Sequence, residues 1–267
     1  MSAPVVTHIE NDIAYVTLNR GDKHNALNMD MFFAISQTIK SLKKNKQIRA
    51  VIVHGDGVDF CTGLDVKSVM NSMGNAVRLL FKWRPGKANL AQYVSTGWQD
   101  IPVPVIMALH GRVWGGGLQI ALGGDFRIAH PDTMLSVMEA RWGLLPDMGG
   151  TISLREHLPT DKAKLLAMTG KELTAEEAHE FGLLTEISNE PLLAAKALAQ
   201  ELLEQSPDSN AAVKKLYSNA WWHSKGFALA RESWYQIKII LGKNQRIKTY
   251  NQLNPEKEKS FKQRVNW

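Results

Sequence analysis

The sequence is almost without cysteine, since Cys61 is the single one among 267 residues. One cysteine cannot form a disulfide within the chain, and it argues against a cysteine-based zinc site. No run of about 18 apolar residues is present, which argues against a membrane-spanning helix. The first ten residues lack the basic segment and the apolar stretch of a signal peptide. We therefore expect a cytoplasmic protein, with Cys61 as a small buried apolar residue.

Two nucleotide-binding motifs are also missing. The glycine run at 115–117 does not fit the pattern G-x-G-x-x-G, and G-x-x-x-x-G-K-[ST] occurs nowhere in the chain. Dinucleotide-binding and nucleoside-triphosphate-binding folds of those types are therefore poor candidates. The length and the hydrophobic fraction of 44% suit one large globular domain, or a domain with a small appendage.

The charge is unbalanced in favour of base, with a net charge of +6 at pH 7. An excess of base attracts anions in general, so nucleic acid, a membrane surface and a phosphorylated cofactor all remain open as partners. The basic residues gather at 40–46 and at 257–264. Both groups are most simply solvated helix ends, where basic side chains complement the helix dipole.

Short apolar segments alternate with helical patterns in the first 160 residues. Residues 13–18 predict a strand in a hairpin, and 50–53, 105–109 and 126–129 predict buried parallel strands. Helices are predicted at 29–44 with Asn28 as N-cap, at 68–81, at 89–98 and after the glycine run. This alternation predicts an α/β fold with a largely parallel sheet.

The later part of the chain has a helical pattern throughout. Thr174 and Glu177 form a capping box at the start of one of these helices. The helices are predicted at 162–168, 174–181, 192–203, 211–222 and 227–241. We expect an α/β core over residues 1–190 and a helical region over 191–267, with the boundary within 184–191.

Two glycine-containing segments follow predicted strands and precede predicted helices, at 60–65 and at 110–118. Ligands collect at the carboxyl ends of parallel strands, where helix N-termini present unpaired N–H groups. Two such junctions side by side can direct two N–H donors at one oxygen and so form an oxyanion hole. On spacing alone, the glycines could equally serve turns or close packing.

Taken in order along the chain, these segments resemble the crotonase superfamily of enoyl-CoA hydratases and isomerases. RGDKHNAL (20–27) resembles its first CoA-contacting loop, and FCTGLDVK lies in a segment, 51–67, that resembles its first oxyanion loop. Residues 101–128 resemble the second oxyanion loop, 135–151 the acid/base loop, and KELTAEEAHEFGLL (171–184) the start of the helical tail.

The resemblance implies a spiral of ββα units whose C-terminal helices associate into a trimer, or a hexamer made of two trimers. It implies oxyanion donors at the backbone N–H groups of Leu64 and Gly116, and no metal or tightly bound cofactor besides CoA within the thioester substrate. Substrate or CoA contacts are expected from Lys23, His24, Ala26, Thr62, Gly63, Asp65, Trp114, Gly115, Gln119 and Trp142. Lys262 would reach the CoA phosphates of a neighbouring subunit.

The acidic residues depart from the pattern of the family's hydratases. Those enzymes use two glutamates, and this chain has Glu139 at the second position but Gln119 at the first, where glutamine cannot take a proton. Asp147 follows Glu139 at the spacing of the dienoyl-CoA isomerases, although it could instead cap a helix starting near Gly149. Trp114 could line the acyl pocket or belong to the core, as could Trp142.

These residues favour an enoyl-CoA or dienoyl-CoA double-bond isomerase in which Glu139, and with it Asp147, moves the proton. An enoyl-CoA hydratase is the first alternative. The second is a non-catalytic homologue that binds CoA or RNA, although nucleic acid fits poorly with the retention of both oxyanion segments and Glu139.

Overall fold

The computed structural model describes residues 3–70, 73–220 and 222–267. Its strands are β1 Val5–Glu10, β2 Ile13–Leu18, β3 Ala50–Gly55, β4 Val105–Leu109, β5 Arg112–Trp114, β6 Phe126–Ala129, β7 Met134–Ser136, β8 Glu172–Leu173 and β9 Glu186–Ile187. Its helices are α1 Met29–Lys44, α2 Val66–Met70, α3 Met73–Leu80, α4 Leu90–Thr96, α5 Gly116–Ala121, α6 Gly150–His157, α7 Thr160–Thr169, α8 Ala175–Glu180, α9 Pro191–Leu203, α10 Pro207–Ala220, α11 Lys225–Ile240 and α12 Lys243–Leu253.

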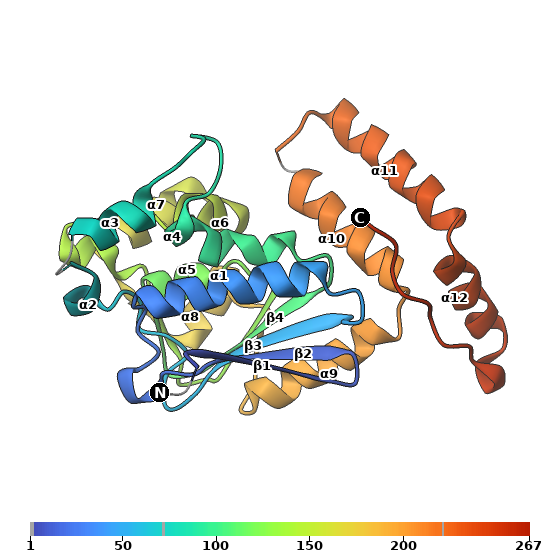
Figure 1. Ribbon diagram of the computed structural model, residues 1–267, viewed down its shortest axis with the longest axis horizontal. Coiled ribbons are helices and arrows are strands. Elements are labelled where there is room, and N and C mark those ends of the chain that lie inside the picture. Colours follow the sequence, from blue (N-terminus) through green and yellow to red (C-terminus); the bar gives the residue numbers. More distant parts are fainter. Residues whose placement is uncertain (1–2, 71–72, 221) are drawn as a thin grey trace.

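A six-stranded sheet in the order β1-β2-β3-β4-β6-β9 forms the centre of the described chain (Figure 1). The hairpin β1–β2 is antiparallel, and every later pairing in this sheet is parallel. A smaller sheet, β5-β7-β8, continues from the ends of these strands. The α/β fold and its largely parallel sheet are therefore confirmed.

The two faces of the large sheet are covered by different helices. Alternate residues of a strand point to opposite faces, and in β3 Val51 and Val53 pack in the core cluster that contains α1 and α4. Ile52 faces the other way, where it packs with Ala195 and Ala199 of α9. Helix α9 thus belongs to the packing of the sheet, and the division of the chain at residue 190 remains a prediction.

The remaining C-terminal helices, α10 to α12, extend away from the sheet (Figure 1). Lys214 of α10 joins this arm to the core, because its buried Nζ donates to the carbonyl oxygens of Trp98 and Val103 and lies 2.7 Å from Asp125 Oδ2. Several apolar side chains of the arm are exposed, among them Trp234, Ile237 and Leu253. No helix among the described residues has the length and apolar character needed to cross a membrane.

Local sequence signals place several elements as predicted. Asn28 caps α1 by accepting a hydrogen bond from Met31 N at 2.9 Å, and Thr174 and Glu177 form the capping box of α8. The helix predicted at 68–81 is divided into α2 and α3, and residues 71–72 lie outside the described part. The helix predicted at 89–98 ends at Thr96 and continues as a 3₁₀ turn to Asp100.

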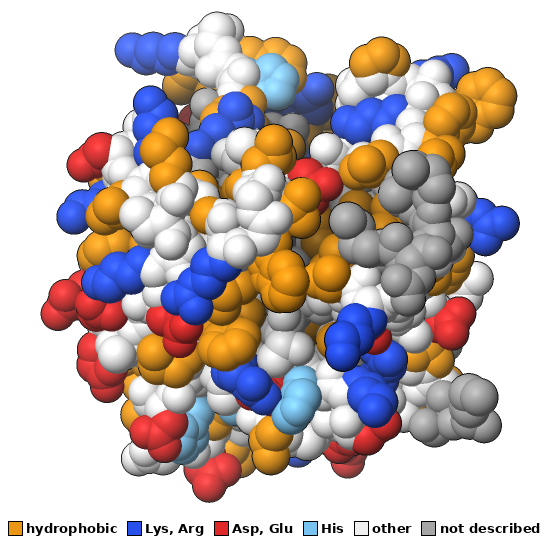
Figure 2. Space-filling model, turned by 90° about the vertical axis from the view of Figure 1, so that its left-hand side faces the viewer, with side chains coloured by type: hydrophobic (Ala, Val, Ile, Leu, Met, Phe, Trp, Pro, Cys, Tyr) orange, Lys and Arg blue, Asp and Glu red, His pale blue; other side chains and the backbone are white. Residues whose placement is uncertain are grey.

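The parallel strands bring the functional segments to one edge of the sheet. β3 ends at Gly55 and β4 at Leu109, and the two strands pair in parallel. The segments that follow them, 56–65 and 110–116, therefore leave the sheet at the same edge. Figure 2 shows the side of the molecule on which α2 and α3 lie, with hydrophobic side chains gathered near its middle and Lys and Arg side chains around them.

Candidate active site

The two glycine-containing segments lie in direct contact. Cys61 pairs with Val113 in an isolated parallel bridge, and Trp114 N donates to Cys61 O at 3.0 Å. A Cβ atom added to Gly63 would lie 2.8 Å from Trp114 O and 3.2 Å from Gly116 N. Gly63 also has a φ of +86°, which side-chain-bearing residues rarely adopt. Glycine is required here because the two backbones approach too closely for a side chain.

Each segment presents a backbone N–H that no acceptor among the described residues satisfies. Gly116 is the first residue of α5 and follows its N-cap, Gly115, so its N–H belongs to the unpaired first turn of the helix. Leu64 follows Gly63, where an added Cβ would lie 3.2 Å from Gly116 N. The dipole of α5 adds a partial positive charge at this point. The pair can therefore stabilise a negatively charged oxygen.

Glu139 lies beside Gly115, the residue before Gly116, on a 3₁₀ turn at Met138–Trp142. A Cβ atom added to Gly115 would be 3.3 Å from Glu139 Oε1. Oε1 accepts a hydrogen bond from Gln119 Nε2 at 2.6 Å, whereas Oε2 is buried and has no partner within the described residues. Burial raises the pKa of Glu139, the hydrogen bond from Gln119 lowers it, and the charge of Asp147 raises it further, for a net increase.

Gln119, on α5, is held in one orientation by its neighbours. Its Oε1 accepts hydrogen bonds from Met148 N at 3.0 Å and from Gly150 N at 2.8 Å. With the oxygen fixed by two N–H donors, the amide nitrogen must face Glu139. Gln119 therefore connects α5 to the acid/base segment and leaves Glu139 Oε2 as the free carboxylate oxygen.

Asp147 does not cap the helix that follows it. Helix α6 begins at Gly150 and its N-cap is Gly149, which makes no side-chain cap. The N–H of Gly150 donates to Gln119 Oε1 and not to Asp147. The helix-cap interpretation of Asp147 is therefore wrong. Asp147 is exposed, and partial desolvation raises its pKa above the ordinary value.

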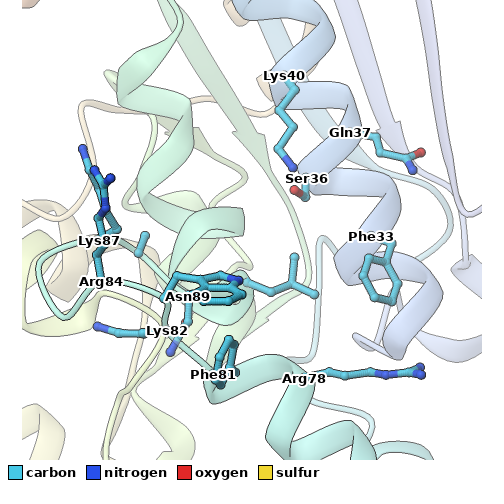
Figure 3. Close-up of a pocket in the computed structure, with 13 residues that line it drawn as sticks. Phe33, Ser36, Gln37, Lys40, Arg78, Phe81, Lys82, Arg84, Lys87 and Asn89 are labelled. Atoms are coloured by element: carbon cyan, nitrogen blue, oxygen red, sulfur yellow. The ribbon is translucent and has the colours of Figure 1, made fainter.

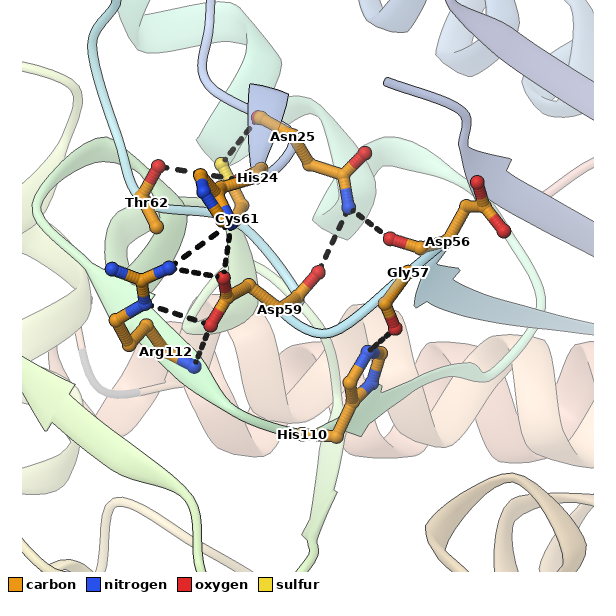
Figure 4. Close-up of polar contacts among 9 residues, drawn as sticks. All are labelled: His24, Asn25, Asp56, Gly57, Asp59, Cys61, Thr62, His110 and Arg112. Atoms are coloured by element: carbon orange, nitrogen blue, oxygen red, sulfur yellow. Dashed lines mark hydrogen bonds and ion pairs between the residues drawn. The ribbon is translucent and has the colours of Figure 1, made fainter. Parts of the chain in front are cut away.

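The first loop, 20–27, is tied to both glycine segments through Asp59 (Figure 4). The Asp59 side chain is 4% exposed and accepts hydrogen bonds from Arg112 N at 2.8 Å, Nε at 2.9 Å and Nη2 at 2.6 Å. His24 Nδ1 lies 2.7 Å from its second oxygen. One carboxylate thus connects three loops that are distant in sequence.

A second residue, Asn25, completes this connection. It is fully buried with φ of +53°, and its Nδ2 donates to Asp56 O and Asp59 O, both at 2.8 Å. Cys61 Sγ contacts Asn25 O at 3.1 Å, and burial raises the pKa of this thiol to about 12. Cys61 is therefore a packing residue, as predicted, and no thiolate forms near neutral pH.

The predicted contact residues of the first two segments occupy one region. Thr62 N and Oγ1 both donate to His24 O, so these two residues adjoin. Lys23 is exposed and Ala26 is half-buried on the same loop. Asp65 forms an ion pair with Arg20 at 3.0 Å and accepts from Ser68 N, so its carboxylate is occupied in joining the loop to α2.

Comparison with known proteins adds to this geometry. A family model described as enoyl-CoA hydratase/isomerase matches residues 8–262. The chain belongs to the enoyl-CoA hydratase/isomerase family. This is the crotonase superfamily, whose enzymes act on CoA thioesters. The chain is similar to the 1,2-epoxyphenylacetyl-CoA isomerase of Escherichia coli, with 29% identity over 87% of this chain and 88% of that protein. It is also similar to the carnitinyl-CoA dehydratase of Salmonella enteritidis, with 30% identity over 77% of this chain and 76% of that one.

The fold agrees with the family. The crystal structure of the enoyl-CoA hydratase from Bacillus anthracis superposes with a TM-score of 0.88 at 23% identity, covering 97% of this chain and 99% of that one. The expected crotonase fold with helices at the C-terminus is thereby confirmed. The named relatives differ in activity, and the family alone does not choose between isomerisation and addition or loss of water.

The two tryptophans differ in their surroundings. Trp142 is 62% exposed, as are Leu144 and Leu145 to a similar degree, so the core alternative for Trp142 is wrong. Trp114 is half-buried, with the Arg112 guanidinium 5.2 Å from the centre of its ring. The segment between Glu139 and Asp147 thus presents apolar side chains at the surface.

Sequence patterns did not identify Asp59, Arg112 or Asn25. Asp59 and Arg112 are 53 residues apart, and although they lie in the two segments that resemble the oxyanion loops, that resemblance gave neither of them a role. The one available signal is positional, since Asp59 directly precedes the first glycine segment and Arg112 lies within the second.

Replacing Asp59 by Asn should destabilise the protein by about 2–3 kcal/mol at pH 7, since Arg112 loses its buried counter-ion. Burial alone would raise the pKa of Asp59, but the hydrogen bonds from Arg112 and His24 outweigh it and hold the pKa below the ordinary 3.8. The stabilisation is therefore present above pH 3.8 and is lost as pH falls through the lower folded value. Urea unfolding from pH 7 to pH 3 measures the difference, with the exposed Asp22→Asn as control; equal stability of Asp59→Asn and wild type at pH 7 would contradict the assignment.

Proposed function

We propose that this enzyme isomerises the double bond of an enoyl-CoA or dienoyl-CoA thioester, with Glu139 as the base that moves the proton. The observation that carries the proposal is the state of the Glu139 carboxylate. One oxygen is held by Gln119 and the other is buried without a partner among the described residues, and the carboxylate lies against Gly115, the residue before Gly116. A single carboxylate so placed can remove a proton from one carbon and return it to another.

The thioester carbonyl oxygen would lie between the N–H groups of Leu64 and Gly116. For a 3-enoyl thioester, Glu139 Oε2 takes a proton from the carbon next to the carbonyl, and the electron pair spreads as a dienolate onto the oxygen. The two donors stabilise that charge, each by roughly 3–4 kcal/mol in the transition state. The protonated Glu139 then gives its proton to the far end of the conjugated system, and the double bond becomes conjugated with the carbonyl.

The raised pKa of Glu139 suits this role, because it makes the carboxylate a stronger base toward a carbon-bound proton than an ordinary carboxylate. Asp147 would supply or accept the second proton when the substrate is a dienoyl thioester. The exposed Trp142 and the half-buried Trp114 would contact the acyl chain, and Gln119 would orient Glu139.

For the rest of the substrate, we propose CoA contacts from Lys23, His24, Ala26, Thr62, Gly63, Asp65 and Gly115. The exposed apolar side chains of α11 and α12 support assembly into a trimer, or a hexamer of two trimers, through the helical region 191–267. Lys262 is exposed on the arm, where its backbone is hydrogen-bonded to Asn244, and in such an assembly it would serve a neighbouring subunit. We also propose that the enzyme is cytoplasmic.

Hydration of a 2-enoyl thioester is the alternative reaction. It requires a water molecule held and activated, and hydratases of this family use two carboxylates for it. Gln119 Oε1 already accepts two backbone hydrogen bonds and its Nε2 is bonded to Glu139, so this side chain offers no basic atom to water. The geometry at Gln119 therefore favours isomerisation.

Glu139→Gln should lower kcat/KM for 3-enoyl-CoA isomerisation by roughly 10²–10⁴-fold, because the amide cannot accept the proton. The assay follows the appearance of conjugated thioester absorbance, with 2-enoyl and dienoyl thioesters tested in parallel. The exposed Glu176→Gln provides a control and should match wild type. Unchanged activity of Glu139→Gln on every substrate would remove Glu139 as the base, and rapid hydration of crotonyl-CoA by wild type would favour the alternative reaction.

The pH dependence should report the surroundings of Glu139. The base acts as a carboxylate, so kcat/KM should fall as pH decreases through its raised pKa. Asp147→Asn removes a charge that raises this pKa, so the acid limb should move to lower pH. Gln119→Leu removes a hydrogen bond that lowers it, so the limb should move to higher pH. Limbs that stay in place in both variants would show that another group controls the profile.

A further inference from the structure

A pocket lies away from the segments proposed to bind the acyl-CoA thioester. It has a volume of about 590 Å³ and is formed by α1, the end of α3 and the segment leading into α4. Figure 3 shows Phe33, Ser36 and Lys40 on α1, with Phe81, Lys82 and Arg84 from the segment opposite. No lining residue belongs to loop 20–27, to 60–65, to 110–119 or to 135–151. The pocket is therefore built from residues that the proposed reaction does not use.

The lining is strongly basic and contains no acid. Its five cationic side chains come from three parts of the chain and are Lys40, Arg78, Lys82, Arg84 and Lys87. None of them forms an ion pair with a described carboxylate; Lys40 instead lies 5.6 Å from the centre of the Tyr93 ring. Like charges gathered without counter-ions repel one another, so this arrangement favours an anion.

Three aromatic side chains accompany the cations. Trp83 is 91% exposed and meets Phe81 edge to face, with ring centres 5.9 Å apart, and Phe33 is also partly exposed. Large exposed aromatic side chains at a pocket are typical of surfaces that bind a flat apolar group. The volume lies within the range of roughly 300–1,000 Å³ that small-molecule sites occupy.

We propose that this pocket binds a mononucleotide carrying several phosphates, separately from the acyl-CoA thioester. The base would stack on Trp83 and Phe81, and the phosphates would pair with the lysine and arginine side chains. A simple carboxylate such as a fatty acid would neutralise one or two of five cations, whereas a di- or triphosphate matches the charge of the whole group. The pocket takes its donors from side chains, so the missing glycine-rich phosphate motifs do not bear on it.

The experiment measures ATP binding by isothermal titration calorimetry at physiological salt, with wild type and two double variants. Lys82→Gln with Arg84→Gln alters the pocket, and Lys44→Gln with Lys46→Gln removes the same charge at the C-terminal end of α1 and just beyond it. The pocket variant should bind ATP at least tenfold more weakly, and the control should stay within twofold of wild type. Trp83→Leu should weaken binding by ~5-fold or more through lost stacking.

A second arm distinguishes a free nucleotide from the nucleotide half of CoA. Saturating CoA should leave the affinity for ATP unchanged, because the two ligands occupy different residues. Full displacement of ATP by CoA would mean that ATP enters the CoA site, and it would overturn the proposal. Absence of ATP binding, or equal weakening in both double variants, would also overturn it. None of these outcomes depends on the reaction proposed for Glu139, since the assay measures binding alone.

Discussion

The proposed active site depends on one close backbone approach, the contact of the turn at Gly63 with the Trp114 carbonyl and Gly116 N–H. Two loops from neighbouring parallel strands meet there without a side chain between them. Their unpaired amides can then share one oxygen, which neither loop could bind as strongly alone. The glycines lower the stability of each loop in isolation, so the surrounding structure has to hold the contact.

Two polar networks provide that support. Asp59 joins the first loop and both glycine segments through Arg112 and His24, and its carboxylate is nearly excluded from water. Gln119 joins α5 to the acid/base segment and at the same time orients Glu139. A glutamate in place of Gln119 would put a second carboxylate beside that of Glu139, and the two negative charges would repel each other. Gln119 therefore holds the acid/base segment in place and also leaves Glu139 as the one carboxylate at this point.

Local signals were sufficient for much of the fold. The N-cap Asn28, the capping box at Thr174 and the alternation of apolar strands with helices predicted the sheet and most helices. Contacts between distant residues were not predictable, because Asp59 and Arg112 become neighbours only once the sheet has formed. Helix α12 was missed because Lys243–Leu253 is largely polar and its apolar residues show no helical spacing. The packing of α9 against the sheet was also not predicted, because it depends on contacts between residues distant in sequence.

The central claim is that two amides polarise a thioester carbonyl, and infrared difference spectroscopy of a bound acyl-CoA with a ¹³C-labelled carbonyl tests it most directly. On binding to wild type, the carbonyl stretch should move to lower wavenumber than in solution, because hydrogen bonds from Leu64 and Gly116 weaken the double bond. In Gly63→Ala the loops must separate, and the shift should largely disappear while the fold is retained by circular dichroism. A carbonyl stretch unchanged between solution and the wild-type complex would contradict the account.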